Sequence, residues 1–396
     1  MLNFGKLMPQ IAEVGQESVN ELDSQEARLL AAQETFDEVT ENPDSFAVRM
    51  LDNVDHAQWP LSIPLEPIST QKSVQPLASP HTVVACDGSQ ILPSHHEVYS
   101  CYLLNIGSAL ITYGTLQPPI LESQPHLYHR PHELYPLING RRMHVDEQFV
   151  ALERNLLELE QVCQRAIAAR ERLQPVVAFV DGSLIPWGMH DMPLPYQTEF
   201  TVRIIGALER LRQYQVPIVG YISHSRSSDL INDLRVWRCP YPKARCRDHC
   251  GSLNEEEYPC SSLWPMTDRQ LLMAALPKHR RTCVFKSSAA ALDAFPLPEK
   301  TCFAYLNVGH EVARLEFPHW VFADSKYFEL MLSATLTQAD KGMGYPVALS
   351  EAHNLAVIRA SDRSKFFDLL TKHLVSLGVG KVRVSPKESR KRRSII

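Results

Sequence analysis

One phrase of the sequence occurs twice and ends each time in an aspartate. The first copy runs Val83-Val84-Ala85-Cys86-Asp87-Gly88-Ser89, and the second runs Val176-Val177-Ala178-Phe179-Val180-Asp181-Gly182-Ser183. Each copy is a short apolar run with β-branched residues, which predicts a buried strand that stops at Asp-Gly-Ser. Two such strands side by side would bring the carboxylates of Asp87 and Asp181 together. Paired carboxylates hold divalent cations or divide acid and base roles, so the repeat predicts a metal site.

Further acidic and imidazole groups follow in a definite order along the chain. Residues 97–115 predict two strands around Asn105-Ile106-Gly107-Ser108, a hairpin. The helix predicted over residues 146–173 carries three candidate ligands, Glu153, Glu158 and Glu160. The last helical region opens with Glu351-Ala352-His353. This order is that of ribonuclease H-like nucleases, whose ligands on a first strand, the next helix, a fourth strand and a late helix surround two divalent ions. Such ions polarise a phosphodiester, generate hydroxide from bound water and stabilise the leaving oxygen.

The same residues resemble one nuclease family. The two Asp-Gly-Ser strands, the glutamate helix between them and the segment Pro346-Val347-Ala348-Leu349-Ser350-Glu351-Ala352-His353 look like NurA over about residues 82–377. The resemblance implies a 5′-to-3′ exonuclease and single-strand endonuclease that acts on DNA in double-strand break end resection. It also implies dependence on Mn²⁺, a homodimer, and docking onto a HerA-like hexameric ATPase.

The resemblance assigns the metal ligands residue by residue. Asp87, Asp181 and His353 match the family's ligands. Family members carry an arginine a few residues before the helix glutamate, and the pair Arg154 and Glu158 satisfies that pattern, so Glu158 is expected to be the fourth ligand. Hard oxygen ligands predict Mg²⁺ or Mn²⁺, and an imidazole among them favours Mn²⁺.

The polar turn Ser223-His224-Ser225-Arg226-Ser227-Ser228 departs from the family pattern. The family is expected to offer a lysine toward the phosphate there, whereas this chain has His224 and Arg226. Arginine can bind a phosphate through two parallel hydrogen bonds, so both residues are predicted to contact the DNA backbone.

Four of the nine cysteines cluster in a segment rich in proline, arginine and acidic residues; they are Cys239, Cys246, Cys250 and Cys260. Four thiolates on a short irregular loop are what a structural Zn²⁺ or an iron–sulfur cluster needs. Their spacing matches no pair of Cys-x-x-Cys knuckles, so ordinary reduced cysteines in an inserted loop remain an alternative. The insertion is not part of the NurA pattern.

Composition sets the outer limits. With 396 residues, 44% hydrophobic and 21% charged, the chain is typical of a globular enzyme, and no apolar run approaches the roughly 20 residues of a membrane-spanning helix. Its start lacks the pattern of a secretory signal, so we expect a cytoplasmic protein without a membrane partner. A formal net charge of −5 gives no global attraction to nucleic acid, so DNA would need a local basic surface.

Periodicity predicts the elements that position these residues. An apolar face at three- and four-residue spacing makes residues 146–173 the clearest helix. Further helices are expected over 198–214, 268–276, 319–336, 349–358 and 363–377, strands over 216–222 and twice within 301–317, and an irregular stretch over 117–137. Strands that alternate with helices after a hairpin predict an α/β fold, a ribonuclease H-like mixed sheet flanked by helices.

Three ranges are expected to organise the chain. Residues 1–80 predict a helical N-terminal extension followed by a Pro-rich linker that no regular element crosses. Residues 81–380 predict the nuclease domain, with the Cys-rich insertion at about 238–262. Residues 381–396 form a basic C-terminal tail, which is either a disordered terminus or an anion contact.

Two other functions fit parts of the sequence. Sugar kinases and actin-like ATPases share the ribonuclease H-like core and use similar loops to bind ATP phosphates, but their loops carry more glycine than this chain, which has 16 glycines and no Gly-Gly pair. A non-catalytic DNA-binding subunit could keep the fold and use the cysteine loop and the basic tail for binding.

Overall fold

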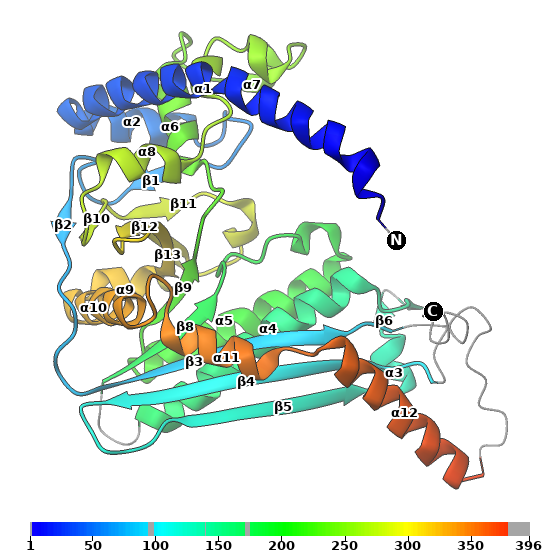
Figure 1. The fold of residues 1–396 in the computed structure, drawn as a ribbon. Coiled ribbons are helices and arrows are strands. Elements are labelled where there is room, and N and C mark those ends of the chain that lie inside the picture. The colour runs from blue at the N-terminus through cyan, green and yellow to red at the C-terminus, as the bar shows by residue number, and fades with distance from the viewer. Residues whose placement is uncertain (1, 94–98, 139, 171–174, 379–396) are drawn as a thin grey trace. The chain divides into compact units, whose positions relative to one another are not determined.

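The computed structural model describes residues 2–93, 99–138, 140–170 and 175–378 (Figure 1). The chain forms two compact units. Unit 1 contains Met1–Val74, Ile222–Ala290 and Cys302–Leu315, and unit 2 contains Gln75–Tyr221, Ala291–Thr301 and Glu316–Ile396. This division differs from the predicted ranges 1–80, 81–380 and 381–396, because the N-terminal helices and the Cys-rich segment belong to one unit. The predicted basic tail lies outside the described residues.

Unit 1 combines helices with short antiparallel strands. Its helices are α1 (Phe4–Glu41), α2 (Pro43–Asn53), α6 (Asp229–Trp237), α7 (Cys246–Cys250) and α8 (Asp268–Ala275). Its strands are β1 (Ser62–Pro64), β2 (Lys72–Ser73), β10 (Arg280–Arg281), β11 (Phe285–Ser287) and most of β12 (Thr301–Asn307). They pair antiparallel in the order β1-β11-β12-β10-β2. A core that includes Phe46, Leu234 and Phe303 holds this unit together.

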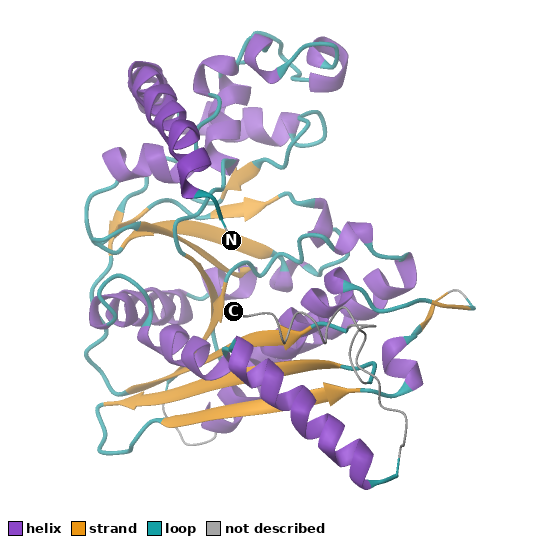
Figure 2. Ribbon diagram, turned by 45° about the vertical axis from the view of Figure 1, so that its right-hand side comes forward, coloured by secondary structure: helices purple, strands orange, loops and turns teal. Residues whose placement is uncertain are grey.

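Unit 2 is built on a mixed sheet. Its strands are β3 (His81–Ile91), β4 (Tyr102–Tyr113), β5 (Ile120–Tyr128), β8 (Val176–Asp181) and β9 (Ile218–Ile222), in the order β9-β8-β3-β4-β5. β3 runs parallel to β8, and β8 runs parallel to β9, whereas β4 is antiparallel to both β3 and β5. Figure 2 shows the long strands of this sheet lying side by side. The mixed α/β class predicted from the sequence is confirmed.

Helices pack against this sheet and carry the candidate ligands. α4 (Glu147–Arg170) contacts β3, β8 and α5 (Leu194–Gln213), and α11 (Val347–Ala356) lies across β3 and β4 (Figure 1). The predicted apolar face of α4 is buried, including Leu156, Leu159 and Val162. The remaining helices of the unit are α3 (Pro131–Leu134), α9 (His319–Ala323), α10 (Ser325–Lys341) and α12 (Ala360–Ser376).

The remaining elements are the strands β6, β7 and β13 and several single 3₁₀ turns. β6 (Leu137–Ile138) and β7 (Arg141–Arg142) pair with each other, and β13 (Val312–Pro318) follows β12. The 3₁₀ turns are Met189–Asp191, Glu255–Glu257, Ser261–Leu263, Ala290–Leu292 and Leu297–Glu299. No described helix is long and apolar enough to cross a membrane.

Four sequence predictions about strands were wrong. β3 does not stop at the first Asp-Gly-Ser, because β4 pairs with it along its full length as far as Ile91. The predicted hairpin within residues 97–115 is instead the single strand β4, and the stretch 117–137, expected to be irregular, contains β5. The linker contains β1, which ends in Pro64, and β2.

Helix predictions fared better, because helical periodicity is a local property. The helices expected over 146–173, 198–214, 268–276, 349–358 and 363–377 correspond to α4, α5, α8, α11 and α12. The helix expected over 319–336 is divided into α9 and α10 at Asp324, whose carboxylate caps α10 by accepting a hydrogen bond from the Lys326 amide. α6 was not predicted.

Candidate active site

Asp87 and Asp181 lie at the same level on neighbouring parallel strands. β3 and β8 pair so that Cys86 is opposite Val180, and the two aspartates are the next residues along. β8 ends at Asp181, where Gly182 turns the chain with φ +99°, a conformation that glycine adopts at little cost. The predicted side-by-side placement of the two strands is therefore confirmed.

Asp87 points to the face of the sheet that α11 covers. It pairs with Gly107 of β4, and paired residues of an antiparallel ladder share a face. Gly107 packs so closely on α11 that a Cβ atom would collide with the backbone carbonyl of Ala352. On this face, Oδ2 of Asp87 lies 2.8 Å from Nδ1 of His353. The contact joins the first predicted ligand to the last.

Gly88, the next residue of β3, points to the opposite face, where α4 packs. A Cβ atom at Gly88 would lie 2.5 Å from Oε1 of Glu158, so the missing side chain makes room for this carboxylate. Glu158 is 5% exposed, and its Oε1 lies 3.1 Å from Nε of Arg154 without a hydrogen bond. Burial raises the pKa of Glu158 to about 8; Arg154 opposes the rise, and the charges of Asp87 and Asp181 add to it.

The structure separates Glu158 from the two other glutamates of α4. Glu153 and Glu160 both pair with Arg203 of α5, at 3.3 Å and 2.9 Å respectively. Neither lines the pocket that contains Glu158. The family resemblance had favoured Glu158 among the three helix glutamates, and Arg203 of α5 engages the other two.

Asp181 keeps solvent contact but is partly desolvated. Loss of water raises the pKa of its carboxyl group, and the negative charge of Asp87 acts in the same direction. A hydrogen bond with Tyr345 and the nearby His353 lower the pKa of Asp181. Tyr345 also packs edge-on against Tyr221, with ring centroids 5.6 Å apart.

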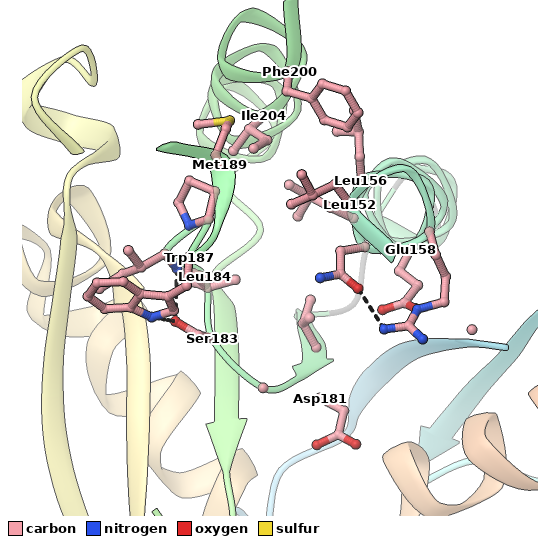
Figure 3. Close-up of a pocket in the computed structure, with 18 of the residues that line it drawn as sticks. Leu152, Leu156, Glu158, Asp181, Ser183, Leu184, Trp187, Met189, Phe200 and Ile204 are labelled. Atoms are coloured by element: carbon pink, nitrogen blue, oxygen red, sulfur yellow. Dashed lines mark hydrogen bonds and ion pairs between the residues drawn. The ribbon is translucent and has the colours of Figure 1, made fainter. Parts of the chain in front are cut away.

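All four predicted ligands line one pocket of about 450 Å³ in unit 2. Figure 3 shows Glu158 on its helix and Asp181 at the end of its strand, and Glu158 is paired with Arg154. Among the described residues, however, no three His, Cys, Asp or Glu side chains are close enough together to hold a metal ion. Asp87 is engaged by His353 and Glu158 by Arg154, so the four line the same space without forming a chelating cluster. The metal site itself stays a prediction.

The model of the NurA domain family matches residues 81–358. The chain belongs to the NurA family. The family expected from the motifs is thereby confirmed, and the matched range contains Asp87, Glu158, Asp181 and His353.

Two solved structures are similar to this NurA-family chain. The NurA nuclease from Sulfolobus solfataricus aligns at 13% identity with a TM-score of 0.45, covering 78% of this chain and 87% of that one. The catalytic domain of human Endonuclease V aligns at 10% identity with a TM-score of 0.33, covering 74% of this chain and 85% of that one. No curated protein matches the chain.

The predicted phosphate contacts lie in unit 1, whereas the four predicted ligands lie in unit 2. Glu311 organises the polar turn by accepting hydrogen bonds from the Ser223 hydroxyl and the His224 amide. His224 has φ +46° and keeps most of its side chain in solvent, and Arg226 is exposed. A role of His224 and Arg226 in binding DNA stays a prediction.

The cysteine segment folds within unit 1 as short helical turns. Cys246 and Cys250 begin and end α7 and are buried, as is Cys260, whereas Cys239 is half-buried; all four are free thiols. Burial raises the pKa of the Cys246 and Cys250 thiols. Cys250 and Cys260 pack with Tyr258. In the described part of the chain these thiols do not form a metal-binding group, so Zn²⁺ or an iron–sulfur cluster stays a prediction.

Three residues of the site were missed by sequence reasoning: two that line the pocket, and Tyr345, which is hydrogen-bonded to Asp181. Tyr345 lies in Gly342-Met343-Gly344-Tyr345-Pro346, directly before the predicted ligand helix, and that position is the signal that could have found it. Trp187 follows the second Asp-Gly-Ser by a few residues and lines the pocket. Gly88 was expected only to lie where a strand stops, because the space it leaves for Glu158 arises only when α4 packs on β3.

Proposed function

We propose that this NurA-family protein is a metal-dependent nuclease that hydrolyses DNA phosphodiesters. One observation carries the proposal: Asp87, Glu158, Asp181 and His353 come from four elements distant in sequence and line a single pocket. Three carboxylates and an imidazole around one pocket suit a hard divalent cation and a phosphodiester.

The donor residues fit a divalent cation in their chemistry. Glu158 is buried, its Oε1 forms an ion pair with Nε of Arg154 at 3.1 Å, and the charges of Asp87 and Asp181 contribute to the raised pKa of Glu158. A cation between these carboxylates would offset their mutual repulsion. When bound, Mn²⁺ or Mg²⁺ would polarise the phosphodiester and lower the pKa of a bound water, in the proposed two-metal mechanism.

The chain's own residues then have distinct tasks. Asp87, Glu158 and Asp181 would hold the cations. Nδ1 of His353 contacts Asp87, which leaves Nε2 of this exposed imidazole as the atom that binds a cation or takes up a proton. Arg154 donates a hydrogen bond to Gln90 at 3.1 Å, and its guanidinium could pair with a phosphate beside Glu158.

We also propose that unit 2 has a ribonuclease H-like core. Asp87 lies on the first long strand, β3, and Asp181 ends β8, the fourth long strand after β4 and β5. Glu158 lies on the helix before β8, and His353 on a late helix. This is the ligand order expected from the sequence.

The finer properties rest on the family resemblance. We propose 5′-to-3′ exonuclease and single-strand endonuclease activities, a preference for Mn²⁺, a homodimer, and docking on a HerA-like hexameric ATPase during end resection. A cytoplasmic location also stays a prediction.

Isosteric variants test the proposed nuclease. Labelled single-stranded and linear duplex DNA would be incubated with wild type, Asp87→Asn, Glu158→Gln or Asp181→Asn in Mn²⁺, Mg²⁺ or EDTA. Each variant is expected to cleave at least about 100-fold more slowly, the scale on which groups acting directly in the chemistry contribute. Glu160→Gln is the matched control, because this glutamate of the same helix pairs with Arg203, and we expect its rate to stay near wild type.

Equal cleavage by wild type and all three variants, or full cleavage in EDTA, would rule the proposal out. If the protein were a DNA-binding subunit or an ATP-dependent phosphotransferase, neither wild type nor any variant would cleave DNA. The ATP-dependent enzyme would also consume ATP without DNA.

A further inference from the structure

The pocket has an apolar half that the chemistry of phosphodiester hydrolysis does not require. Figure 3 shows side chains from α4, α5 and the segment after β8 facing this space. They include Leu152, Leu156, Leu184, Met189, Phe200 and Ile204. The polar half, with Asp181 and Glu158, opens into the same cavity of about 450 Å³, which lies within the range of roughly 300–1,000 Å³ of small-ligand sites.

Trp187 lines this pocket and keeps an exposed ring that is nevertheless tethered. The side chain is 50% exposed, and its Nε1 donates a hydrogen bond to Oγ of Ser183 at 3.1 Å. Ser183 in turn donates to Glu316 at 2.7 Å, and Glu316, 1% exposed, also accepts from the Leu184 amide at 2.9 Å. A buried carboxylate thus orders the turn that follows Asp181 and fixes the ring that lines the pocket.

We propose that this apolar half binds one unpaired nucleobase, with Trp187 as its stacking surface. The inference rests on the proposed function, since it names the part of the substrate that lies beside the phosphate being cleaved. A nucleotide joins a charged phosphate to a flat ring with apolar faces. The pocket joins the same two chemistries, with carboxylates that suit a metal-bound phosphate on one side and aliphatic and aromatic side chains on the other.

The base in the pocket must be unpaired. A base inside a continuous duplex is stacked on both faces and cannot enter a protein cavity unless it is extruded. Single strands and frayed ends present bases that need no extrusion, so they are the favoured substrates. Aromatic stacking accepts every base, so this site contributes affinity and position without sequence preference.

Binding is measured without cleavage by tryptophan fluorescence in EDTA. The probes are a short single-stranded oligothymidylate and an abasic oligomer of the same length and charge. We expect the oligothymidylate to quench the tryptophan fluorescence of wild type and of Trp320→Phe. The fluorescence of Trp187→Phe should lack the part of this quench that comes from Trp187. Trp320 is the matched control, because it lies in the same unit, outside the pocket, against Tyr327. The abasic oligomer should produce no Trp187-dependent quench.

Cleavage is measured on single strands that carry one abasic residue at successive positions. In wild type, one bond at a constant offset from the abasic residue is expected to be cut about ten-fold more slowly than the same bond in an intact strand. This factor corresponds to the energy of stacking one base. Trp187→Ala should slow every bond about ten-fold and remove this dependence on the abasic position. Trp187→Phe keeps an aromatic face and should recover most of the rate.

The outcomes separate the two proposals. A Trp187-dependent quench without cleavage under any condition supports the base site and overturns the proposed nuclease. Cleavage that requires Asp87 and Asp181, but is indifferent to abasic residues and to Trp187→Ala, overturns the base site and leaves the nuclease standing. An equal quench by the abasic oligomer also overturns the base site.

Discussion

At the residue scale, the two Asp-Gly-Ser copies perform different tasks. In the first copy the chain stays extended, so Asp87 faces α11 and Gly88 faces α4. In the second copy the strand ends, and Gly182 forms a turn with positive φ. The first glycine is required because Glu158 occupies the space of a side chain, and the second because the backbone turns there. The same tripeptide sequence therefore meets two different structural requirements.

The first requirement predicts the effect of Gly88→Ala. The added Cβ would lie 2.5 Å from Oε1 of Glu158 and 2.9 Å from Cγ of Arg154, so one of these side chains must move. We expect a loss of about 1–3 kcal/mol of unfolding free energy, typical of overpacking, together with reduced DNA cleavage. Urea unfolding and the cleavage assay measure the two effects.

Gly206→Ala is the matched control for this substitution. Gly206 lies within α5, and a Cβ atom there would have no neighbour within 4 Å. Alanine should stabilise the helix by about 0.5–1 kcal/mol and leave cleavage unchanged. If the two variants behaved alike, the close packing of Glu158 over Gly88 would not matter to the site.

At the element scale, side chains of the sheet hold α11 in place. The last carbonyl groups of a helix lack partners within the helix. Here Asn105 of β4 donates to the carbonyls of Leu355 and Ala356, at 3.1 Å and 2.8 Å, and Ser89 of β3 also donates to Ala356. Because His353 belongs to the last turns of α11, these hydrogen bonds help to hold its imidazole within hydrogen-bonding distance of Asp87.

Asn105→Ala tests this support. The substitution would remove the side-chain donor to the Leu355 carbonyl and one of the two donors to the Ala356 carbonyl, and we expect a loss of about 1–3 kcal/mol of stability. Cleavage should fall at the same time, because α11 is free to shift and His353 with it. Thermal unfolding and cleavage rates measure the two effects.

Gln124→Ala, an exposed position on the adjacent strand β5, should change neither quantity. Unaltered cleavage by a destabilised Asn105→Ala variant would contradict the positioning role.

At the scale of the whole molecule, unit 1 has a buried charge network of its own. Arg314, 1% exposed, donates hydrogen bonds to Asp229 at 2.7 Å and to the Tyr305 hydroxyl at 3.1 Å. That hydroxyl donates to Asp268, which also accepts from the Ile231 amide at 2.8 Å. Burial raises the pKa of Asp268 to about 7, and the nearby Asp229 acts in the same direction.

A raised carboxyl pKa makes stability depend on pH. The folded protein binds the Asp268 proton more tightly than the unfolded chain does, so the stabilisation is complete below the unfolded pKa of about 4. It is lost as the pH rises through about 7. Relative to Asp268→Asn, wild type should therefore lose stability across this window, by at most about 1.4 kcal/mol per pH unit.

Urea unfolding of wild type and Asp268→Asn, measured from about pH 4 to 8, would check how the difference in their stability changes with pH. Asp293→Asn, at an exposed position, serves as the control and should run parallel to wild type. A constant difference between wild type and Asp268→Asn at every pH would contradict the prediction.

The sequence by itself determined the local and periodic features of this protein. The apolar face of α4, the strand that ends at Asp181 and the helix that carries His353 follow from residue spacing, because a helix and a strand end are largely local. The motifs were also enough to identify the NurA family.

Tertiary structure decided which of these residues meet. Strand pairing with β4 carried β3 beyond Asp87 and replaced the predicted hairpin, and packing against α5 engaged Glu153 and Glu160 while Glu158 lined the pocket. Tyr345 and Trp187 joined the site in the same way. These outcomes depend on contacts between residues far apart in the chain, and no local pattern encodes such contacts.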